Sequence, residues 1–298
     1  MIIPEYLKQG DKIGLVATAR KISKKELSPA INLLESWGLQ ILFGDNLLQE
    51  YNQFSGTISQ RVCDIQQMID DDDIKAIFCV RGGYGTVQII DLINFDKLLK
   101  SPKWIIGYSD VTVLHSHMHN LGLSSMHATM PINFQENTNE SIKNLHAALF
   151  GLKYCIKASA HRLNKYGTIE CEIVGGNLSI LYSLLGSSSD IDTAGKILFL
   201  EDLDEYLYHI DRMIINLKRN NKFQNIKALI IGAMSNMNDN KIPFGLNAEE
   251  IIHMHIKEFN FPVCFGFPAG HINNNQIIKL GVKSSLEINA KGVVLRQE

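Results

Sequence analysis

The sequence predicts an α/β protein in which a doubly wound parallel sheet is followed by a second domain of α+β type. Three observations lead to this prediction. Strand-like and helix-like stretches alternate through the first half of the chain, and repeated βα units form parallel sheets with right-handed crossovers. The alternation changes after about residue 150. The chain has 298 residues, which is more than one hydrophobic core usually serves, and 45% of them are apolar, as in a globular protein.

The elements of the first half follow one another in a regular order. Short apolar runs predict strands, and apolar residues three or four positions apart predict helices. Gly38 ends the first predicted helix, in keeping with the frequency of glycine at helix ends. The predicted strands span residues 12–18, 40–43, 76–80 and 104–106, and the predicted helices span residues 24–37, 60–69, 88–93 and a segment that begins at Asp110.

The second half mixes strands and helices less regularly. We expect the boundary between Phe150 and Tyr166, and we assign residues 1–155 to an N-terminal α/β domain and residues 166–298 to a C-terminal domain. The predicted strands of this half span residues 153–157, 167–174, 196–200, 228–231 and 286–288, and its predicted helices span residues 178–185, 207–218 and 248–257.

The composition excludes several classes of protein. A net charge of −2 gives no electrostatic footprint for nucleic acid or for an anionic membrane. No apolar run reaches the length that spans a bilayer, and the N-terminus lacks the pattern of a secretory signal. The five cysteines are scattered without Cys-x-x-Cys spacing, which argues against disulfides and zinc. We therefore expect a cytoplasmic protein.

One short stretch has the form of a nucleophile elbow. The uncharged run at residues 104–106 predicts a buried strand, Gly107 suits a tight turn, and a helical period begins at Asp110. Such a turn lifts the Ser109 side chain above the carboxyl edge of the sheet, beside the free N–H groups of a helix N-terminus. The usual Gly-x-Ser-x-Gly spelling is absent. The alternative is that Ser109 is a turn residue and Asp110 a helix N-cap.

A glycine-rich loop follows the predicted strand at residues 76–80. It reads Arg81-Gly82-Gly83-Tyr84-Gly85, and its glycines let the backbone approach a ligand closely. The N–H groups of such a loop can stabilise an oxyanion. The spacing fits neither a dinucleotide-binding fingerprint nor a P-loop. A plain tight turn explains the glycines equally well.

A carboxylate and a histidine in the second half could complete a serine triad. Glu201 and Asp202 come just past an apolar strand, where a carboxylate can orient an imidazole. Their alternative role is to cap the next helix, and Glu205 is a nearby competitor. His271 lies in a Gly/Pro-rich loop and could serve as the general base. The resulting order is Ser109, Glu201, His271, the chain order of nucleophile, acid and histidine in α/β-hydrolases.

Three other histidines follow the elbow at every second position. His115, His117 and His119 do not share one face of a helix at this spacing, so they do not predict a metal site. We expect neither a metal nor a cofactor.

Taken together, these motifs resemble the LD-carboxypeptidases, the muramoyltetrapeptide carboxypeptidase family of serine peptidases. They occur in the family's order and cover nearly the whole chain. The segments that carry the resemblance are residues 10–17, 78–85, 106–112, 175–179, 198–202 and 266–271.

The resemblance implies a Rossmann-like N-terminal domain and a smaller C-terminal domain of strands and helices. It also implies a cytoplasmic homodimer that acts in peptidoglycan recycling without a metal, on a muropeptide, cleaving the terminal D-alanine from an L-configured centre through an acyl-enzyme.

The same resemblance assigns roles to individual residues. Ser109 is the expected nucleophile, His271 the expected general base and Glu201 the acid that orients it. The backbone N–H groups of Asp110 and Gly83 are the expected oxyanion donors. Gly176 and Asn177, together with Gly82, are expected to bind substrate. Apart from the resemblance, Arg81 is a candidate for binding the free carboxylate of the substrate, and the alternative is that it forms a structural ion pair.

The chain departs from the family pattern after the acid, at residues 204–212, and after the histidine, at residues 277–281. Both departures concern the fit of the substrate more than the chemistry. Two alternatives stay open: hydrolysis of an antibiotic acyl-adenylate of the microcin C7 type, and binding of muropeptides without catalysis. The first would need an aromatic platform for the base, whereas Trp37 and Trp104 are both expected to be buried. The second is disfavoured by the presence of all three triad candidates.

Overall fold

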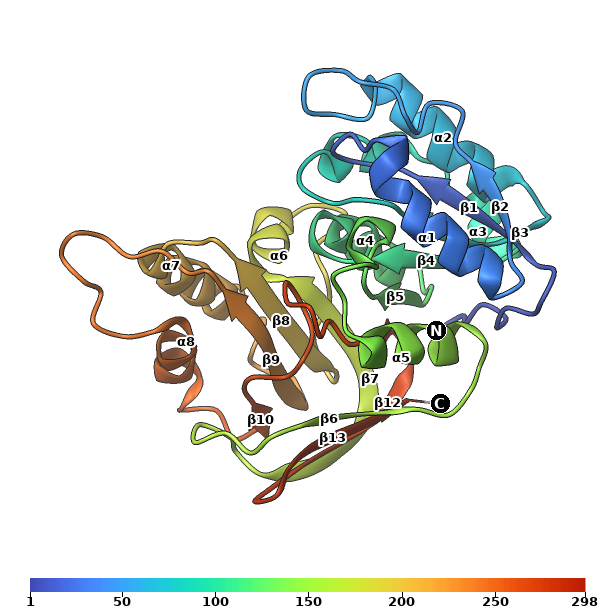
Figure 1. The fold of residues 1–298 in the computed structure, drawn as a ribbon. Coiled ribbons are helices and arrows are strands. Elements are labelled where there is room, and N and C mark those ends of the chain that lie inside the picture. The colour runs from blue at the N-terminus through green and yellow to red at the C-terminus, as the bar shows by residue number, and fades with distance from the viewer. Residues whose placement is uncertain (298) are drawn as a thin grey trace.

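The computed structural model describes residues 1–297 and has two lobes, each built around one β-sheet (Figure 1). The sheet of the first lobe has the strand order β11-β5-β4-β3-β1-β2. Its first five strands along the chain run parallel, and β11 pairs antiparallel with β5 at one edge. The strands are β1 (Lys12–Val16), β2 (Gln40–Phe43), β3 (Ile74–Cys79), β4 (Trp104–Gly107), β5 (Ser125–His127) and β11 (Ile278–Leu280).

Helices cover both faces of this sheet, as the doubly wound prediction requires (Figure 1). One buried cluster joins α1 and α5 to the face that carries Ile13 and Leu15. A second cluster joins α2, α3 and α4 to the opposite face, which carries Ile74 and Ile77. The helices are α1 (Lys24–Ser36), α2 (Ile58–Asp70), α3 (Asp96–Lys100), α4 (Thr112–Asn120) and α5 (Asn139–Leu149).

The sheet of the second lobe is mixed. Its order is β10-β9-β8-β7-β12-β13-β6, parallel from β10 to β7 and antiparallel beyond. The helices α6 (Leu178–Leu184), α7 (Leu207–Arg219) and α8 (Ala248–Ile256) pack on the parallel part. The strands are β6 (Cys155–Ala158), β7 (Gly167–Asn177), β8 (Ile197–Leu203), β9 (Ala228–Ser235), β10 (Val263–Cys264), β12 (Lys283–Asn289) and β13 (Gly292–Gln297).

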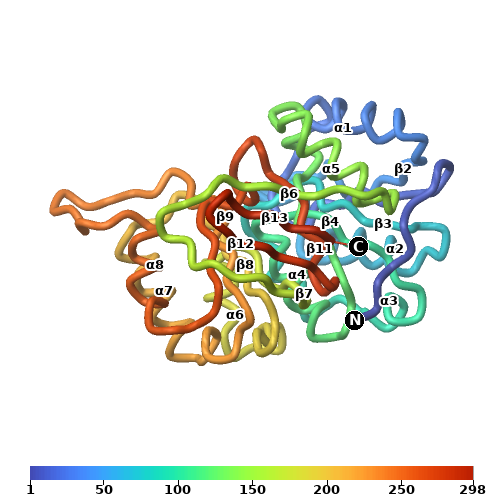
Figure 2. The backbone as a smooth tube through the Cα atoms, turned by 90° about the horizontal axis from the view of Figure 1, so that it is seen from below, coloured from blue at the N-terminus to red at the C-terminus, as the bar shows by residue number. Residues whose placement is uncertain are grey.

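The predicted fold class, a parallel α/β sheet followed by a second sheet-containing domain, is confirmed. The chain nevertheless crosses between the lobes near its end, because β11 returns to the first sheet while β12 and β13 belong to the second. Figure 2 shows β11 from below, where it pairs with β5 at the edge of the first sheet. The division into residues 1–155 and 166–298 therefore describes the order of the chain and stays a prediction about independent domains.

Some local predictions are wrong. The predicted helix at residues 88–93 is two short 3₁₀ turns, Thr86–Gln88 and Ile90–Leu92. Glu201 and Asp202 lie inside β8 and do not follow it. Trp104 is fully buried as expected, but Trp37 is partly exposed and packs edge-on against His146, with ring centroids 5.0 Å apart.

Candidate active site

The predicted elbow exists, and Ser109 occupies its strained position. Strand β4 ends at Gly107, a 3₁₀ turn spans Ser109–Val111, and α4 begins at Thr112. Ser109 has φ of 63°, a left-handed value that non-glycine residues seldom adopt. The close passage of the turn requires Gly107, since a Cβ there would lie 2.8 Å from Val111 Cγ2. Strain of this kind concentrates at functional sites, where the surrounding structure enforces it.

The side chain of Asp110 ties this elbow to the glycine loop. Its Oδ2 accepts a hydrogen bond from the Thr86 N–H at 2.9 Å. Burial raises the pKa of the Asp110 carboxyl, while the bond from Thr86 and the Arg61 charge oppose the rise. Arg61 is itself buried and donates to the Gly85 carbonyl at 2.9 Å. The loop and the elbow thus form one unit.

The glycine loop passes close to the Ser109 side chain. A Cβ on Gly82 would lie 3.4 Å from Ser109 Oγ, so the loop backbone passes directly against the hydroxyl. Gly83 has φ of 114°. Within residues 1–297, the N–H groups of Gly83 and Asp110 have no hydrogen-bond acceptor. Unpaired donors of this type can hold a developing oxyanion.

The predicted acid and histidine meet in the second lobe. Glu201 is fully buried, and its Oε2 lies 2.7 Å from Nδ1 of His271, whose side chain is 13% exposed. This bond assigns the proton to Nδ1 and leaves Nε2 as the acceptor. Gly270 has φ of 113°, and a Cβ there would lie 2.6 Å from Glu201 Oε2. The glycine before the histidine is therefore required for the approach of the two side chains.

Asn177 holds the two carboxylates of β8. Its Nδ2 donates to Asp202 Oδ1 at 2.9 Å and to Glu201 Oε1 at 3.3 Å. Its own N–H donates to Thr112 Oγ1 of α4 at 3.0 Å, which links the two lobes. Asn177 is buried, so its observed contacts are with the acid rather than with open space. Its predicted place in the substrate cleft, like that of Gly176, stays a prediction.

These contacts set the protonation of the site. Burial alone lowers the pKa of His271, but the charge and hydrogen bond of Glu201, helped by Asp202, outweigh it and raise the pKa above the usual value. Burial, together with the charge of Glu201, raises the pKa of Asp202 to about 7. The charge of Glu201 thus opposes the ionisation of its buried neighbour Asp202.

The elbow and the histidine come together through Tyr108. The ring of this residue, which precedes Ser109, lies 4.8 Å from the imidazole ring of His271 between centroids. Within the described residues, no hydrogen bond joins Ser109 to His271. Catalytic hydrogen bonds are often long without substrate and tighten when it binds. The ring contact places His271 beside the residue that precedes Ser109, and a direct contact between Ser109 and His271 stays a prediction.

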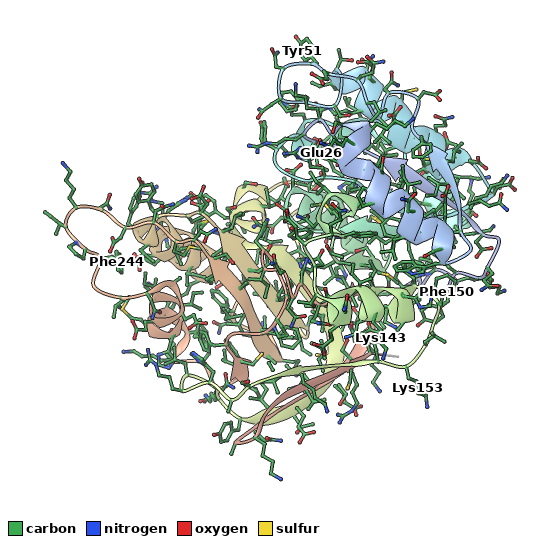
Figure 3. All side chains as sticks on the ribbon, viewed as in Figure 1. Glu26, Tyr51, Lys143, Phe150, Lys153 and Phe244 are labelled. Atoms are coloured by element: carbon green, nitrogen blue, oxygen red, sulfur yellow. The ribbon has the colours of Figure 1, made fainter. Side chains whose placement is uncertain are left out.

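Arg81 and Glu205 make other contacts. Nη1 of Arg81 donates to the Lys21 carbonyl at 3.0 Å and lies 3.6 Å from Oε1 of Glu26, which is in the first turn of α1 (Figure 3). This is the structural ion pair that competes with a role in binding. Glu205 pairs with His209 at 2.6 Å, so of the two glutamates only Glu201 contacts His271.

His127 was not singled out by the sequence analysis. It is fully buried at the end of β5, with its ring 5.8 Å from that of Tyr108 and 4.8 Å from that of Phe199. Burial, and then the nearby His115 and His271, hold its pKa well below the usual value. A neutral imidazole is therefore packed against Tyr108 and Phe199. A three-residue strand is too short to give a periodic signal that would have revealed it.

Residues 1–297 contain neither a metal-binding cluster nor a membrane-spanning helix. No cluster of three or more His, Cys, Asp or Glu side chains is arranged to hold a metal ion. No helix in that range is long and apolar enough to cross a bilayer. His115 instead bonds to Ser125 and to the Gly107 carbonyl, which supports the elbow.

Known proteins are similar to this chain in sequence or in fold over nearly their whole length. A probable murein peptide carboxypeptidase of Bacillus subtilis is 34% identical, covering 98% of this chain and 93% of that protein. A murein tetrapeptide carboxypeptidase of Pseudomonas aeruginosa is 27% identical, with 93% and 94% covered. The microcin C7 self-immunity protein of Escherichia coli is 25% identical, with 97% and 94% covered.

The crystal structure of a muramoyltetrapeptide carboxypeptidase from Oxalobacter formigenes has the same fold, with a TM-score of 0.88 at 24% identity, covering 96% of this chain and 98% of that one. The sequence also matches the LD-carboxypeptidase N-terminal domain over residues 13–128 and the LD-carboxypeptidase C-terminal domain over residues 170–286. On these matches and on its 34% identity to the Bacillus subtilis protein, the chain belongs to the LD-carboxypeptidase family.

Proposed function

We propose that this protein is a serine carboxypeptidase of peptidoglycan recycling that removes the terminal D-alanine from muramoyl tetrapeptides. The bond cleaved joins an L-configured centre, either L-lysine or the L end of meso-diaminopimelate, to that D-alanine. The names of the Bacillus subtilis and Pseudomonas aeruginosa relatives support a carboxypeptidase that acts on murein peptides. We further propose that it works as a cytoplasmic homodimer without a cofactor.

One observation carries the proposal. A fully buried glutamate, Glu201, holds Nδ1 of His271 at 2.7 Å, and the histidine packs on the residue that precedes an elbow serine. An acid, an imidazole and a strained serine in this arrangement suit acyl transfer. A protein that only bound peptides would have no need for this arrangement.

In the first half of the reaction, Nε2 of His271 takes the proton of Ser109 as the hydroxyl oxygen attacks the scissile carbonyl. The backbone N–H groups of Gly83 and Asp110 stabilise the negative charge that develops on the carbonyl oxygen. One such donor contributes about 3–4 kcal/mol in comparable sites. His271 then gives its proton to the leaving amine, the C–N bond breaks, and D-alanine departs.

In the second half, water replaces D-alanine. His271 takes a proton from the water, whose oxygen attacks the ester carbonyl of the acyl-enzyme, and then returns that proton to Ser109 Oγ. The products are the tripeptide and the free enzyme. Glu201 accepts the hydrogen bond from Nδ1 of His271 and stabilises the imidazolium in both halves.

The acyl-adenylate alternative lacks support from the tryptophans. Trp104 is fully buried, and its Nε1 donates to the Glu5 carbonyl at 3.0 Å. Trp37 packs against His146 in the first lobe. Neither ring is free to stack on a base. The similarity to the microcin C7 self-immunity protein keeps this reaction as the comparison to run in the assay.

The test is a product analysis. The purified protein is incubated with muramoyl tetrapeptides that carry either meso-diaminopimelate or L-lysine third, with matched peptides that end in L-alanine, and with an aspartyl adenylate. Mass spectrometry should detect the tripeptide and free alanine from the D-alanine peptides alone. Release of L-alanine at an equal rate would contradict the stereochemical proposal, and cleavage of the adenylate alone would contradict the substrate class.

A further inference from the structure

A carboxypeptidase must recognise the free carboxylate at the end of its substrate. In the proposed reaction this carboxylate belongs to the leaving D-alanine, and its carbon is only roughly 3–4 Å from the scissile carbonyl carbon. A carboxylate that leaves water without a partner is costly, and arginine is the residue best suited to bind it with two parallel hydrogen bonds. The inference below rests on the proposed function and identifies this cation.

Two arginines near the glycine loop are already engaged. Arg81 bonds to the Lys21 carbonyl and pairs with Glu26. Arg61 is buried, where it donates to the carbonyls of Thr18 and Gly85 and lies over the ring of Phe54 at 4.8 Å. The charge of Arg81 is shared with Glu26, and the guanidinium of Arg61 is buried, so neither is an unpaired, exposed cation.

Arg20 is different. It is exposed, and within residues 1–297 its guanidinium has no hydrogen bond or ion pair. Its side chain lies across Gly83, because a Cβ on that glycine would lie 2.5 Å from Arg20 Cδ and 2.8 Å from its Nε. Its backbone is anchored, since its N–H points to the Gly82 carbonyl at 3.4 Å. An unpaired cation is therefore held on the loop that carries the expected oxyanion donors.

Ser109 lies against the same loop, one residue away. Gly82 faces Ser109 Oγ, and Gly83 faces Arg20. The strand order explains this meeting: β1 and β3 are neighbours, and the chain leaves β1 toward β2 but leaves β3 toward β4. Loops that diverge in this way at the carboxyl edge of a parallel sheet open the crevice where ligands bind. Arg20 follows β1 and the glycine loop follows β3.

We propose that Arg20 binds the terminal carboxylate of the substrate and so restricts the enzyme to the last peptide bond. Gly83 then has two roles. Its N–H faces the developing oxyanion, and its missing side chain leaves space for the arginine. A peptide whose terminal carboxylate is amidated would lose the ion pair and bind poorly.

The test compares two substrates in the wild-type protein and in three variants, Arg20→Gln, Lys21→Gln and Arg81→Gln. The substrates are one tetrapeptide with a free terminal carboxylate and the same peptide ending in D-alaninamide. The wild-type protein should prefer the free acid in kcat/KM by on the order of 10²–10³-fold. Arg20→Gln should lose most of that preference by slowing with the acid and not with the amide. Lys21→Gln removes an equal charge from the next residue, and it should keep the wild-type preference.

The outcomes separate the two proposals. If Arg20→Gln keeps the wild-type preference for the acid, or if Arg81→Gln is the variant that loses it, Arg20 is not the carboxylate ligand and the carboxypeptidase assignment stands. If the wild-type protein cleaves neither tetrapeptide, the proposed function is wrong, and so is the proposed role of Arg20. The thermal unfolding midpoint of Arg20→Gln should match that of the wild-type protein, because within residues 1–297 the exposed guanidinium has no hydrogen bond or ion pair to lose.

Discussion

The two sides of the candidate site are held by different means. On the side of the first lobe, backbone conformation does the work: Ser109 has a positive φ, and the nearby N–H groups of Gly83 and Asp110 have no acceptor within residues 1–297. On the side of the second lobe, buried side chains do it: Glu201, Asp202 and Asn177 hold one another and His271 through hydrogen bonds.

The difference matches what each side has to do. Donors that wait for a charge must be unoccupied before the charge forms, so the first side is left unsatisfied and partly open. A general base must point in one direction in one tautomer, so the second side is fully bonded. Changes on the first side should therefore reduce activity when they remove a reacting atom. Changes on the second side should reduce activity when they disturb the geometry of the hydrogen-bonded side chains.

Removal of the nucleophile should have the largest effect. Ser109→Ala deletes the attacking oxygen, and we expect the release of D-alanine to fall by about 10⁴-fold or more. Far-UV circular dichroism should be unchanged. Ser59→Ala, an exposed serine on α2, is the control and should keep full activity. Wild-type rates in Ser109→Ala would remove this residue from the mechanism.

Neutralising the buried acid should come next. Glu201→Gln keeps the shape of the side chain but cannot stabilise the imidazolium, so we expect a loss of about 10²–10⁴-fold in kcat. Glu205→Gln breaks the pair with His209 and should change the rate by less than about fivefold. A larger loss in Glu205→Gln than in Glu201→Gln would show that the wrong glutamate has been chosen.

A change of backbone geometry tests the second side without removing a functional group. Gly270→Ala places a Cβ 2.6 Å from Glu201 Oε2, and the misplaced acid should lower kcat/KM by about 10²-fold. Gly266→Ala is matched to it, because Gly266 also has a positive φ, 66°, but its Cβ would meet nothing within 4 Å. Equal losses in both variants would indicate backbone strain alone.

We expect the smallest effect in the pH dependence of kcat/KM. His271 acts as a base only when neutral, and the pKa of its imidazole is raised, so kcat/KM should increase with pH through an inflection above the ordinary histidine value of about 6.5. Below the inflection the increase should be about tenfold per pH unit. In Glu201→Gln the inflection should move to lower pH, because burial then dominates. An inflection that stays in place would exclude this carboxylate as the source of the shift.

Much of the fold could be predicted from the sequence. The strand at residues 40–43 matches β2, and the helix at residues 207–218 matches α7 to within one residue, since both carry clear apolar patterns. The three-residue strands β5 and β11 are too short to show a period. The six-residue stretch at 88–93 is too short for a stable α-helix and folds as 3₁₀ turns. The helix α5 was not predicted, although Thr138 as an N-cap and the spacing of Leu145 and Leu149 are signals of a helix there.

The candidate site, like the fold, could be predicted only in part from the sequence. Residue type and chain order indicate Ser109, Glu201 and His271, and the contact between the last two agrees with that reading. The bonds of Asn177 depend on the register that pairs it with Glu201 across β7 and β8. The free guanidinium of Arg20 depends on which neighbours are already occupied. Neither register nor occupancy can be read from a single sequence.

The return of β11 to the first sheet has a consequence for how the molecule can be taken apart. Seven residues after His271, the chain crosses to pair with Ser125–His127, and it then goes back to complete the other sheet. A fragment that stops before this crossing would leave the edge of β5 bare, and a fragment that begins after residue 150 would carry an orphan strand. The two lobes therefore share the last part of the chain. Neither lobe can be transferred to another protein without removing a strand from the other lobe.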